Sequence, residues 1–202
     1  MEYEAKFQLP HLAEIRKRVL ERGGQLLQER MLERNLRFDD EQGSLSASYQ
    51  VLRLRQDREV TMTYKRGIGR FESRIEIELH VDDFNKARAF LESLGYTVMH
   101  EYEKYREIFA LNSAQVMLDE LPFGCFVEVE AGSLDAVERH SVALGFTWGK
   151  RVQTTYLELF NRLQKNLHFD FSDATFQNFD SLDQETRGLI SASLTEFHSQ
   201  LE

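Results

Sequence analysis

The chain has 202 residues, of which 42% are hydrophobic and 29% are charged, and its formal net charge is −9. This length and composition are typical of one globular domain with a full core. The acidic excess argues against a general nucleic-acid or membrane-surface binder, although it leaves room for a local basic cavity.

Cysteine usage and hydropathy indicate the compartment. Cys125 is the only cysteine, so a disulfide within the chain is excluded and a reducing compartment is favoured. Its apolar neighbours favour a buried structural thiol over a catalytic one. The N-terminus is charged and lacks the apolar core of a signal peptide, and no apolar run approaches the ~20 residues that span a bilayer. We therefore expect a cytoplasmic protein.

The first half of the chain combines several strands with one amphipathic helix. Residues 1–7 alternate as a strand, and Pro10 opens a helix that ends at Gly23-Gly24. Small and polar residues predict a loop over 40–49. The remaining strands are expected as one or two over 25–39 and as a three-stranded meander near 51–55, 60–66 and 71–81.

The second half contains two more helices that follow strands. Asp82 or Asp83 is expected to cap a helix that ends at Gly95. Another helix begins near Ser133 and ends at Gly145. The strands are predicted at 96–99, 103–111, 114–121 and 126–130, and a last amphipathic helix is marked by Ile190, Leu194 and Phe197.

Alternation gives at least five of these strands one apolar and one charged face. The charged rows are Glu2, Glu4 and Lys6; Arg53 and Arg55; Thr61, Thr63 and Lys65; Arg74, Glu76, Glu78 and His80; and Glu128 and Glu130. One interpretation is an antiparallel sheet with a solvated face. Because basic and acidic residues are segregated into separate rows, we favour a barrel whose interior is charged. Such an interior requires counter-ions, namely a polyanion for the basic rows and a divalent metal for the acidic rows.

The ordered set of motifs resembles the CYTH family, also called triphosphate tunnel metalloenzymes. The motifs are Glu2-x-Glu4-x-Lys6, Leu52-Arg53-Leu54-Arg55, Thr63-Tyr64-Lys65-Arg66, Arg74-x-Glu76-x-Glu78, Leu118-Asp119-Glu120 and Phe126-Val127-Glu128-Val129-Glu130. The resemblance covers Met1 to about Phe160. It implies an α+β fold with a mainly antiparallel, closed eight-stranded β-barrel and helices packed outside.

The resemblance also divides the chain into two parts. Residues 1–165 are expected to form the tunnel domain, whose closing helix begins within Thr154–Leu159. Residues 166–202 are expected to form a C-terminal helical extension that packs on the barrel, and one hypothesis is that it covers a mouth of the tunnel and limits substrate size. The aromatic residues expected to pack there are Phe169, Phe171, Phe176 and Phe179.

Site roles follow from the resemblance. It implies that Mg²⁺ or Mn²⁺ binds the acids, with Asp119 available to a second metal. The implied metal ligands are Glu2, Glu4, Asp119, Glu128 and Glu130. The implied substrate-binding residues are Lys6, Arg37, Arg53, Arg55, Lys65, Arg74, Arg106 and Lys150. The implied catalytic residues are Lys6, Arg53, Arg55, Lys65, Glu76 and Glu78.

Three of these assignments have alternatives. Arg37 is either a tunnel residue or a solvent-exposed strand arginine. Lys150 or Arg151 replaces a family lysine that is a threonine at the matching positions here, or that contact is missing. Glu76 and Glu78 are extra metal ligands, ion-pair partners of the arginines or water-orienting groups, and we favour the last two roles.

The motifs are compatible with more than one function. The favoured function is a metal-dependent triphosphatase acting on tripolyphosphate, thiamine triphosphate or a nucleoside triphosphate. The alternatives are a class IV adenylate cyclase and a non-catalytic polyphosphate sensor. The expected partner is a small-molecule triphosphate, with no nucleic acid and no membrane, and a homodimer is an open alternative to a monomer.

Overall fold

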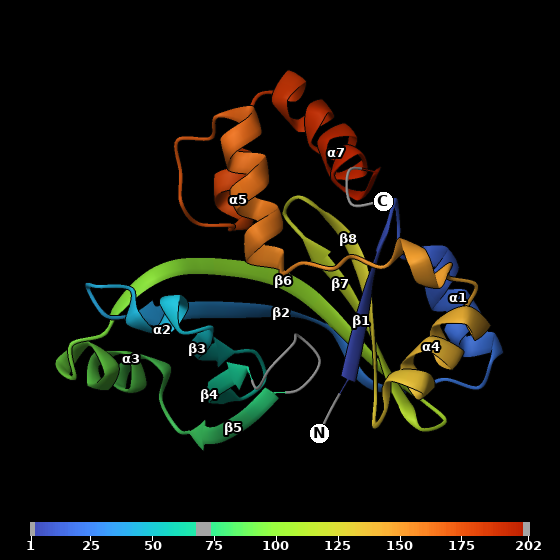
Figure 1. The fold of residues 1–202 in the computed structure, drawn as a ribbon, viewed down its shortest axis with the longest axis horizontal. Coiled ribbons are helices and arrows are strands. Elements are labelled where there is room, and N and C mark those ends of the chain that lie inside the picture. The colour runs from blue at the N-terminus through green and yellow to red at the C-terminus, as the bar shows by residue number, and fades with distance from the viewer. Residues whose placement is uncertain (1–2, 68–73, 200–202) are drawn as a thin grey trace.

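The structure is a computed structural model that describes residues 3–67 and 74–199. Eight strands form one antiparallel sheet in the order β1-β8-β7-β6-β2-β3-β4-β5 (Figure 1). The strands are β1 (Tyr3–Leu9), β2 (Gln25–Asp39), β3 (Gln50–Gln56), β4 (Val60–Gly67), β5 (Arg74–Val81), β6 (Thr97–Leu111), β7 (Ala114–Leu121) and β8 (Gly124–Ala131). The helices are α1 (Ala13–Glu21), α2 (Ser44–Ala47), α3 (Phe84–Ser93), α4 (Leu134–Ala143), η1 (Trp148–Lys150), α5 (Tyr156–Leu167), α6 (Phe176–Asp180) and α7 (Gln184–Ser199). The predicted α+β class is therefore confirmed.

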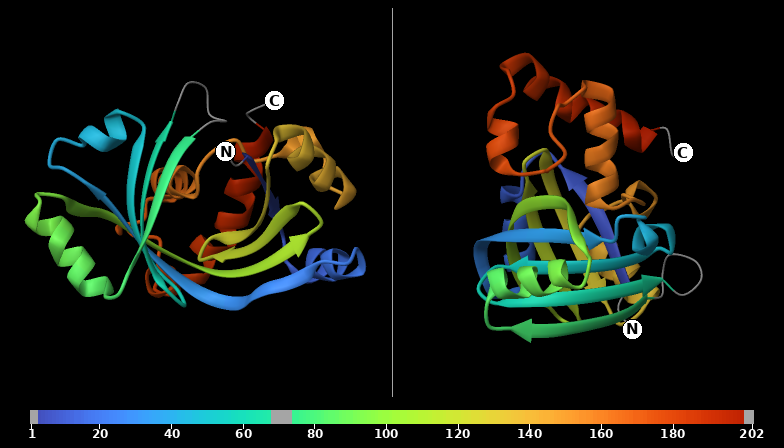
Figure 2. Two further views of the ribbon diagram at one scale, coloured as in Figure 1. Left: turned by 90° about the horizontal axis from the view of Figure 1, so that it is seen from below. Right: turned by 90° about the vertical axis from the view of Figure 1, so that its left-hand side faces the viewer.

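The two longest strands, β2 and β6, join two lobes of the sheet. Each has 15 residues, and they pair along most of their length. Strand β7 pairs with β6 only over Tyr105–Leu111, and β3 pairs with β2 only over Arg34–Phe38. The β1/β7/β8 lobe and the β3–β5 lobe therefore extend from different ends of this pair, and the sheet curves strongly between them (Figure 2).

The closed barrel that we expected is not confirmed. Strands β1 and β5 are the two edges of the sheet, and no hydrogen-bonded pairing joins them within residues 3–67 and 74–199. A barrel has no edge strands, because its first and last strands pair with each other. The described sheet is thus a curved, open one with a concave face.

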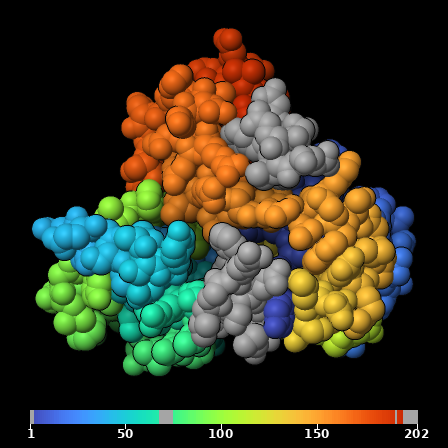
Figure 3. Space-filling model, in the orientation of Figure 1, coloured from blue at the N-terminus to red at the C-terminus, as the bar shows by residue number. Residues whose placement is uncertain are grey.

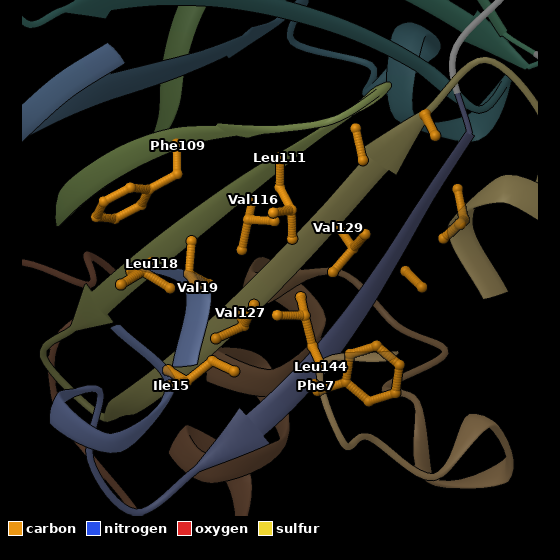
Figure 4. Packing of buried hydrophobic residues seen from close by; sticks show 14 of the residues in the cluster. Phe7, Ile15, Val19, Phe109, Leu111, Val116, Leu118, Val127, Val129 and Leu144 are labelled. Carbon is orange, nitrogen blue, oxygen red and sulfur yellow. The ribbon is translucent and has the colours of Figure 1, made fainter. Parts of the chain in front are cut away.

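Helices cover the convex face of both lobes. Helices α1 and α4 pack on the β1/β7/β8 lobe, where Phe7, Val116 and Val129 are buried (Figure 4). Helix α3 packs on the other lobe, against Leu36 and Leu54. The side chains of Ser133 and Asp83 accept hydrogen bonds from backbone amides in the first turns of α4 and α3, as expected of N-caps. Because the apolar rows face these helices, the concave face is left to the charged rows.

Several elements differ from the sequence prediction. Strand β6 is continuous where two strands were predicted, and β2 is a single strand. The predicted loop over 40–49 contains the short helix α2. Alternation is obscured in β6 because Glu101 occupies the convex row, where its carboxylate pairs with Arg34 in place of an apolar contact.

The three C-terminal helices form a further core at one end of the sheet. They enclose Phe123, Phe126, Phe160 and Phe179, and in the space-filling view the C-terminal segment lies across the top of both lobes (Figure 3). Helix α5 crosses the boundary predicted between residues 165 and 166. Ala174 adds a parallel bridge to β6 beyond the end of β7. Within the described residues, no helix is long and apolar enough to cross a membrane.

Candidate functional site

The charged rows predicted from the sequence meet on the concave face, because strand register places them opposite one another. On the β1/β7/β8 side, Glu4 lies opposite Glu130 and Lys6 opposite Glu128. The same face continues across the sheet through these opposed pairs: Arg106 and Asp119, Glu33 and Lys104, Arg37 and Arg53, Arg53 and Thr63, Thr63 and Glu78, and Lys65 and Glu76. One polar surface therefore extends over all eight strands.

Acids and bases compensate one another on the β1/β7/β8 side. The ammonium of Lys6 lies 3.1 Å from a carboxylate oxygen of Glu128. Arg106 donates to both Asp119 and Glu128 through Nη2, and its Nε donates to Asp119 over 2.6 Å. Lys104 Nζ donates to Asp119 Oδ2 over 3.2 Å. Because Asp119 and Lys104 are almost fully buried, this network is an internal ion-pair cluster.

Glu33 belongs to this cluster and was missed from the sequence. Glu33 is 1% exposed, Lys104 Nζ lies 3.6 Å from its carboxylate, and Asn35 Nδ2 donates to that carboxylate over 2.9 Å. Burial alone would raise the pKa of Glu33, but Lys104, Arg106 and Arg53 outweigh it and lower the pKa to about 2. Burial would likewise raise the pKa of Glu128, but the charges of Lys6 and Arg106 outweigh it and hold that pKa well below its usual range.

Tyr156, in the first turn of α5, covers the Phe126 end of the concave face. Its hydroxyl donates to Asp119 Oδ2 over 2.8 Å, and the Lys6 ammonium lies 3.7 Å from its ring centroid. Burial, followed by the charges of Asp119 and Glu128, raises the pKa of Tyr156 well above its ordinary value. The hydroxyl therefore stays protonated, and the helix is anchored directly to the ion-pair cluster.

The β3–β5 side carries looser contacts around its basic groups. Lys65 Nζ lies 2.7 Å from Glu76, but Arg55 lies 3.5 Å from Asp57 and 3.8 Å from Glu78. The Nε atoms of Arg53 and Arg55 are buried and have no hydrogen-bond partner in the described part of the chain. The described residues themselves therefore leave part of the hydrogen-bonding capacity of these two guanidinium groups unfilled.

The acid pair at the edge of the sheet fits a divalent metal. Glu4 is exposed, Glu130 is half-buried, and they lie directly opposite each other on antiparallel strands. Carboxylate oxygens are hard ligands of the kind that divalent cations such as Mg²⁺ prefer. Mg²⁺ is commonly held by one or two carboxylates together with substrate phosphates and water. Two facing carboxylates therefore suit that ion.

The other implied metal ligands have different surroundings. No group of three or more His, Cys, Asp or Glu side chains suited to a metal occurs among the described residues. Asp119 accepts from Arg106, Lys104 and Tyr156, so a second metal there would have to displace these donors. Glu2 lies outside the described residues. The metal ligand set thus stays a prediction.

Three predicted substrate contacts have different outcomes. Arg37 is half-buried on the concave face, opposite Arg53. Arg74 begins β5, but its side chain is outside the described part. Lys150 is exposed in η1, and no described contact joins it to the concave face.

Two further predictions, for Arg151 and Cys125, can also be compared with the structure. Arg151, the alternative to Lys150, stacks 4.5 Å from the Trp148 ring. Cys125 is half-buried, where we expected a buried thiol, and burial raises the pKa of its thiol, which lowers its reactivity.

Comparison with known proteins identifies the family. The CYTH domain model matches residues 1–143. The chain belongs to the CYTH family. The match ends at the last residue of α4, so α5, α6 and α7 of this CYTH protein lie outside it. No curated protein sequence matches the chain.

Solved structures share the CYTH fold. A candidate adenylate cyclase from Vibrio parahaemolyticus has a TM-score of 0.70 and 21% identity, over 79% of this chain and 97% of that chain. A protein from Pyrococcus horikoshii has a TM-score of 0.66 and 24% identity, over 80% and 98%. A candidate adenylyl cyclase from Hippeastrum, described with a dominant triphosphatase activity, has a TM-score of 0.58 and 17% identity, over 80% and 95%. At these identities the likeness shows the fold.

Proposed function

We propose that this CYTH protein is a divalent-metal-dependent triphosphatase that hydrolyses a small-molecule triphosphate on its concave face. The observation that carries the proposal is the division of one polar surface into a facing acid pair, Glu4 and Glu130, and a basic side with unsatisfied arginine donors. Family membership supports it, as does the triphosphatase activity described for the Hippeastrum neighbour.

The basic side supplies the contacts for the phosphate chain. Arg53 and Arg55 offer planar guanidinium groups that bind phosphate oxygens bidentately, whereas Lys65 acts as a point charge. Lys6 and Arg106 extend this surface toward the acids, although each is already paired with Glu128. The phosphate chain would therefore be held mainly by the arginines of β3.

The acid side supplies the metal ligands. Glu4 and Glu130 would hold Mg²⁺ or Mn²⁺, together with Glu2 and phosphate oxygens. When bound, the metal supplies neutralisation of phosphate charge and lowers the pKa of a coordinated water. The chain's own groups orient the substrate between the two sides, and the contacts of Glu76 with Lys65 and of Glu78 with Arg55 support a partner role for these acids.

Product analysis tests the proposal. Purified protein is incubated with tripolyphosphate, thiamine triphosphate or ATP in the presence of Mg²⁺ or Mn²⁺, with a chelator as control. We expect chelator-sensitive release of orthophosphate from at least one substrate. Cyclic AMP and pyrophosphate from ATP would contradict the hydrolase in favour of a cyclase. Tight triphosphate binding without any product would contradict it in favour of a sensor.

A further inference from the structure

A buried hydroxyl connects the two arginines of β3 through an acid on β5. Thr63 lies on β4, opposite Arg53 on one side and opposite Glu78 on the other. Arg53 Nη2 donates to Thr63 Oγ1 over 3.3 Å, and Thr63 Oγ1 donates to Glu78 Oε2 over 3.1 Å. Thr63 is 0% exposed, so water does not compete for either hydrogen bond.

The same carboxylate oxygen also faces the second arginine. Arg55 Nη2 lies 3.8 Å from Glu78 Oε2. Thr63 therefore orients Glu78 toward Arg55 while it holds one terminal nitrogen of Arg53. The Nε atoms of both arginines have no hydrogen-bond partner among the described residues. Each arginine therefore has an acid or hydroxyl contact at a terminal nitrogen and an Nε without a hydrogen bond in the described part of the chain, although Arg55 Nε also lies 3.5 Å from Asp57 Oδ2.

We propose that Thr63 is a positioning residue for triphosphate binding. Its hydroxyl accepts a hydrogen bond from Arg53 and donates one to Glu78. These two bonds hold the arginine pair in one geometry before the anion binds. Such preorganisation improves binding because less side-chain freedom is lost in the complex. The inference rests on the proposed function, and it assigns Glu78 to arginine positioning in place of metal binding.

The chain offers a matched control two residues away. Thr61 lies on the same strand and the same face, and it is 1% exposed. Unlike Thr63, its Oγ1 has no hydrogen-bond partner within the described residues. Thr61→Val and Thr63→Val therefore make the same chemical change in similar surroundings. Only Thr63→Val removes the hydrogen bonds that join Arg53 to Glu78.

The test compares tripolyphosphate binding by calorimetry, measured with a chelator so that no substrate is hydrolysed, with KM and kcat in Mg²⁺ and with the unfolding midpoint. Thr63→Val should weaken binding about tenfold, the usual consequence of losing a hydrogen bond to a charged group. KM should rise by a similar factor, whereas kcat should change less. Thr63→Ser, which keeps the hydroxyl, should bind tripolyphosphate with wild-type affinity, and so should Thr61→Val. Thr63→Ala provides the same readout if the valine variant does not fold.

Two results would overturn the inference and leave the proposed function intact. One is wild-type affinity in Thr63→Val, and the other is an equal loss in Thr61→Val. A merely structural role for Thr63 would lower the unfolding midpoint without the change in KM. If the wild type binds none of tripolyphosphate, thiamine triphosphate and ATP, the proposed function fails and the inference fails with it.

Discussion

The two sides of the concave face use charge differently. On the β1/β7/β8 side, Asp119 and Glu128 are buried, as is Glu33 on the adjoining strand β2, and each contacts a base within the chain. On the β3–β5 side, Arg53 and Arg55 keep unsatisfied nitrogen atoms, and the contacts of Arg55 with acids are 3.5 and 3.8 Å long. Before any ligand binds, the acids of the first side are closely paired, whereas the arginines of the second side have longer contacts with acids and donors left unsatisfied by the described residues.

This difference separates stability from binding. Breaking one member of a buried ion pair leaves an uncompensated charge and is strongly destabilising. Removing an arginine that has few partners costs the fold little but removes a contact to the anion. Substitutions on the two sides should therefore have opposite profiles in unfolding and in binding experiments.

The largest effect on stability is expected from Asp119→Asn. The change leaves Arg106 and Lys104 buried without their shared carboxylate, and it should lower the free energy of unfolding by about 3–5 kcal/mol. Glu120→Gln, which breaks an exposed pair with Arg30, is the control and should cost below about 1 kcal/mol. Urea unfolding measures both. Equal, small losses would show that the cluster is not a stabilising unit.

Acid should act on the same cluster. The pKa of Glu33 in the folded protein is about 2, below its ordinary value of 4.5, so its stabilising contribution is complete above pH 4.5 and is lost as the pH falls toward 2. The loss from Glu33 alone is on the order of 3 kcal/mol. Unfolding free energies measured across this range should decline, and less steeply in Glu33→Gln. An identical slope in wild type and variant would contradict this assignment.

The smallest effect on stability, with a clear effect on binding, is expected from Arg55→Ala. It should weaken tripolyphosphate binding about tenfold or more, because a charge-assisted contact is lost. Arg58→Ala removes the same charge from an exposed turn and should leave affinity unchanged. Calorimetry compares the two variants. Equal affinities would place Arg55 outside the binding surface.

Strand alternation predicted most of this face because side chains with period 2 share one side of a strand. It succeeded for Lys6, Arg53 and Glu128, whose intervening residues are apolar. It failed for Glu33, because its neighbour Arg34 occupies the convex row and pairs there with Glu101. A charge on both rows removes the contrast on which the pattern depends.

Long-range geometry was beyond the sequence pattern. Alternation says which residues share a face but not which strands form the edges, so the edge positions of β1 and β5 required the structure. The contact between Tyr156 and Asp119 was also not predicted, because it joins a helix to a strand across the fold. Formation of this contact depends on the tertiary packing of α5 and not on any local propensity.

The measurement that tests the account most directly is the affinity of a non-hydrolysable imido analogue of tripolyphosphate for wild type and Glu130→Gln, each with Mg²⁺ and with a chelator. The account predicts that Mg²⁺ strengthens binding to the wild type, because the metal links the acid pair to the phosphates. In Glu130→Gln this strengthening should be lost, while metal-free binding stays equal or improves because a repelling charge is gone. Full strengthening by Mg²⁺ in Glu130→Gln would contradict the assignment of the acid pair.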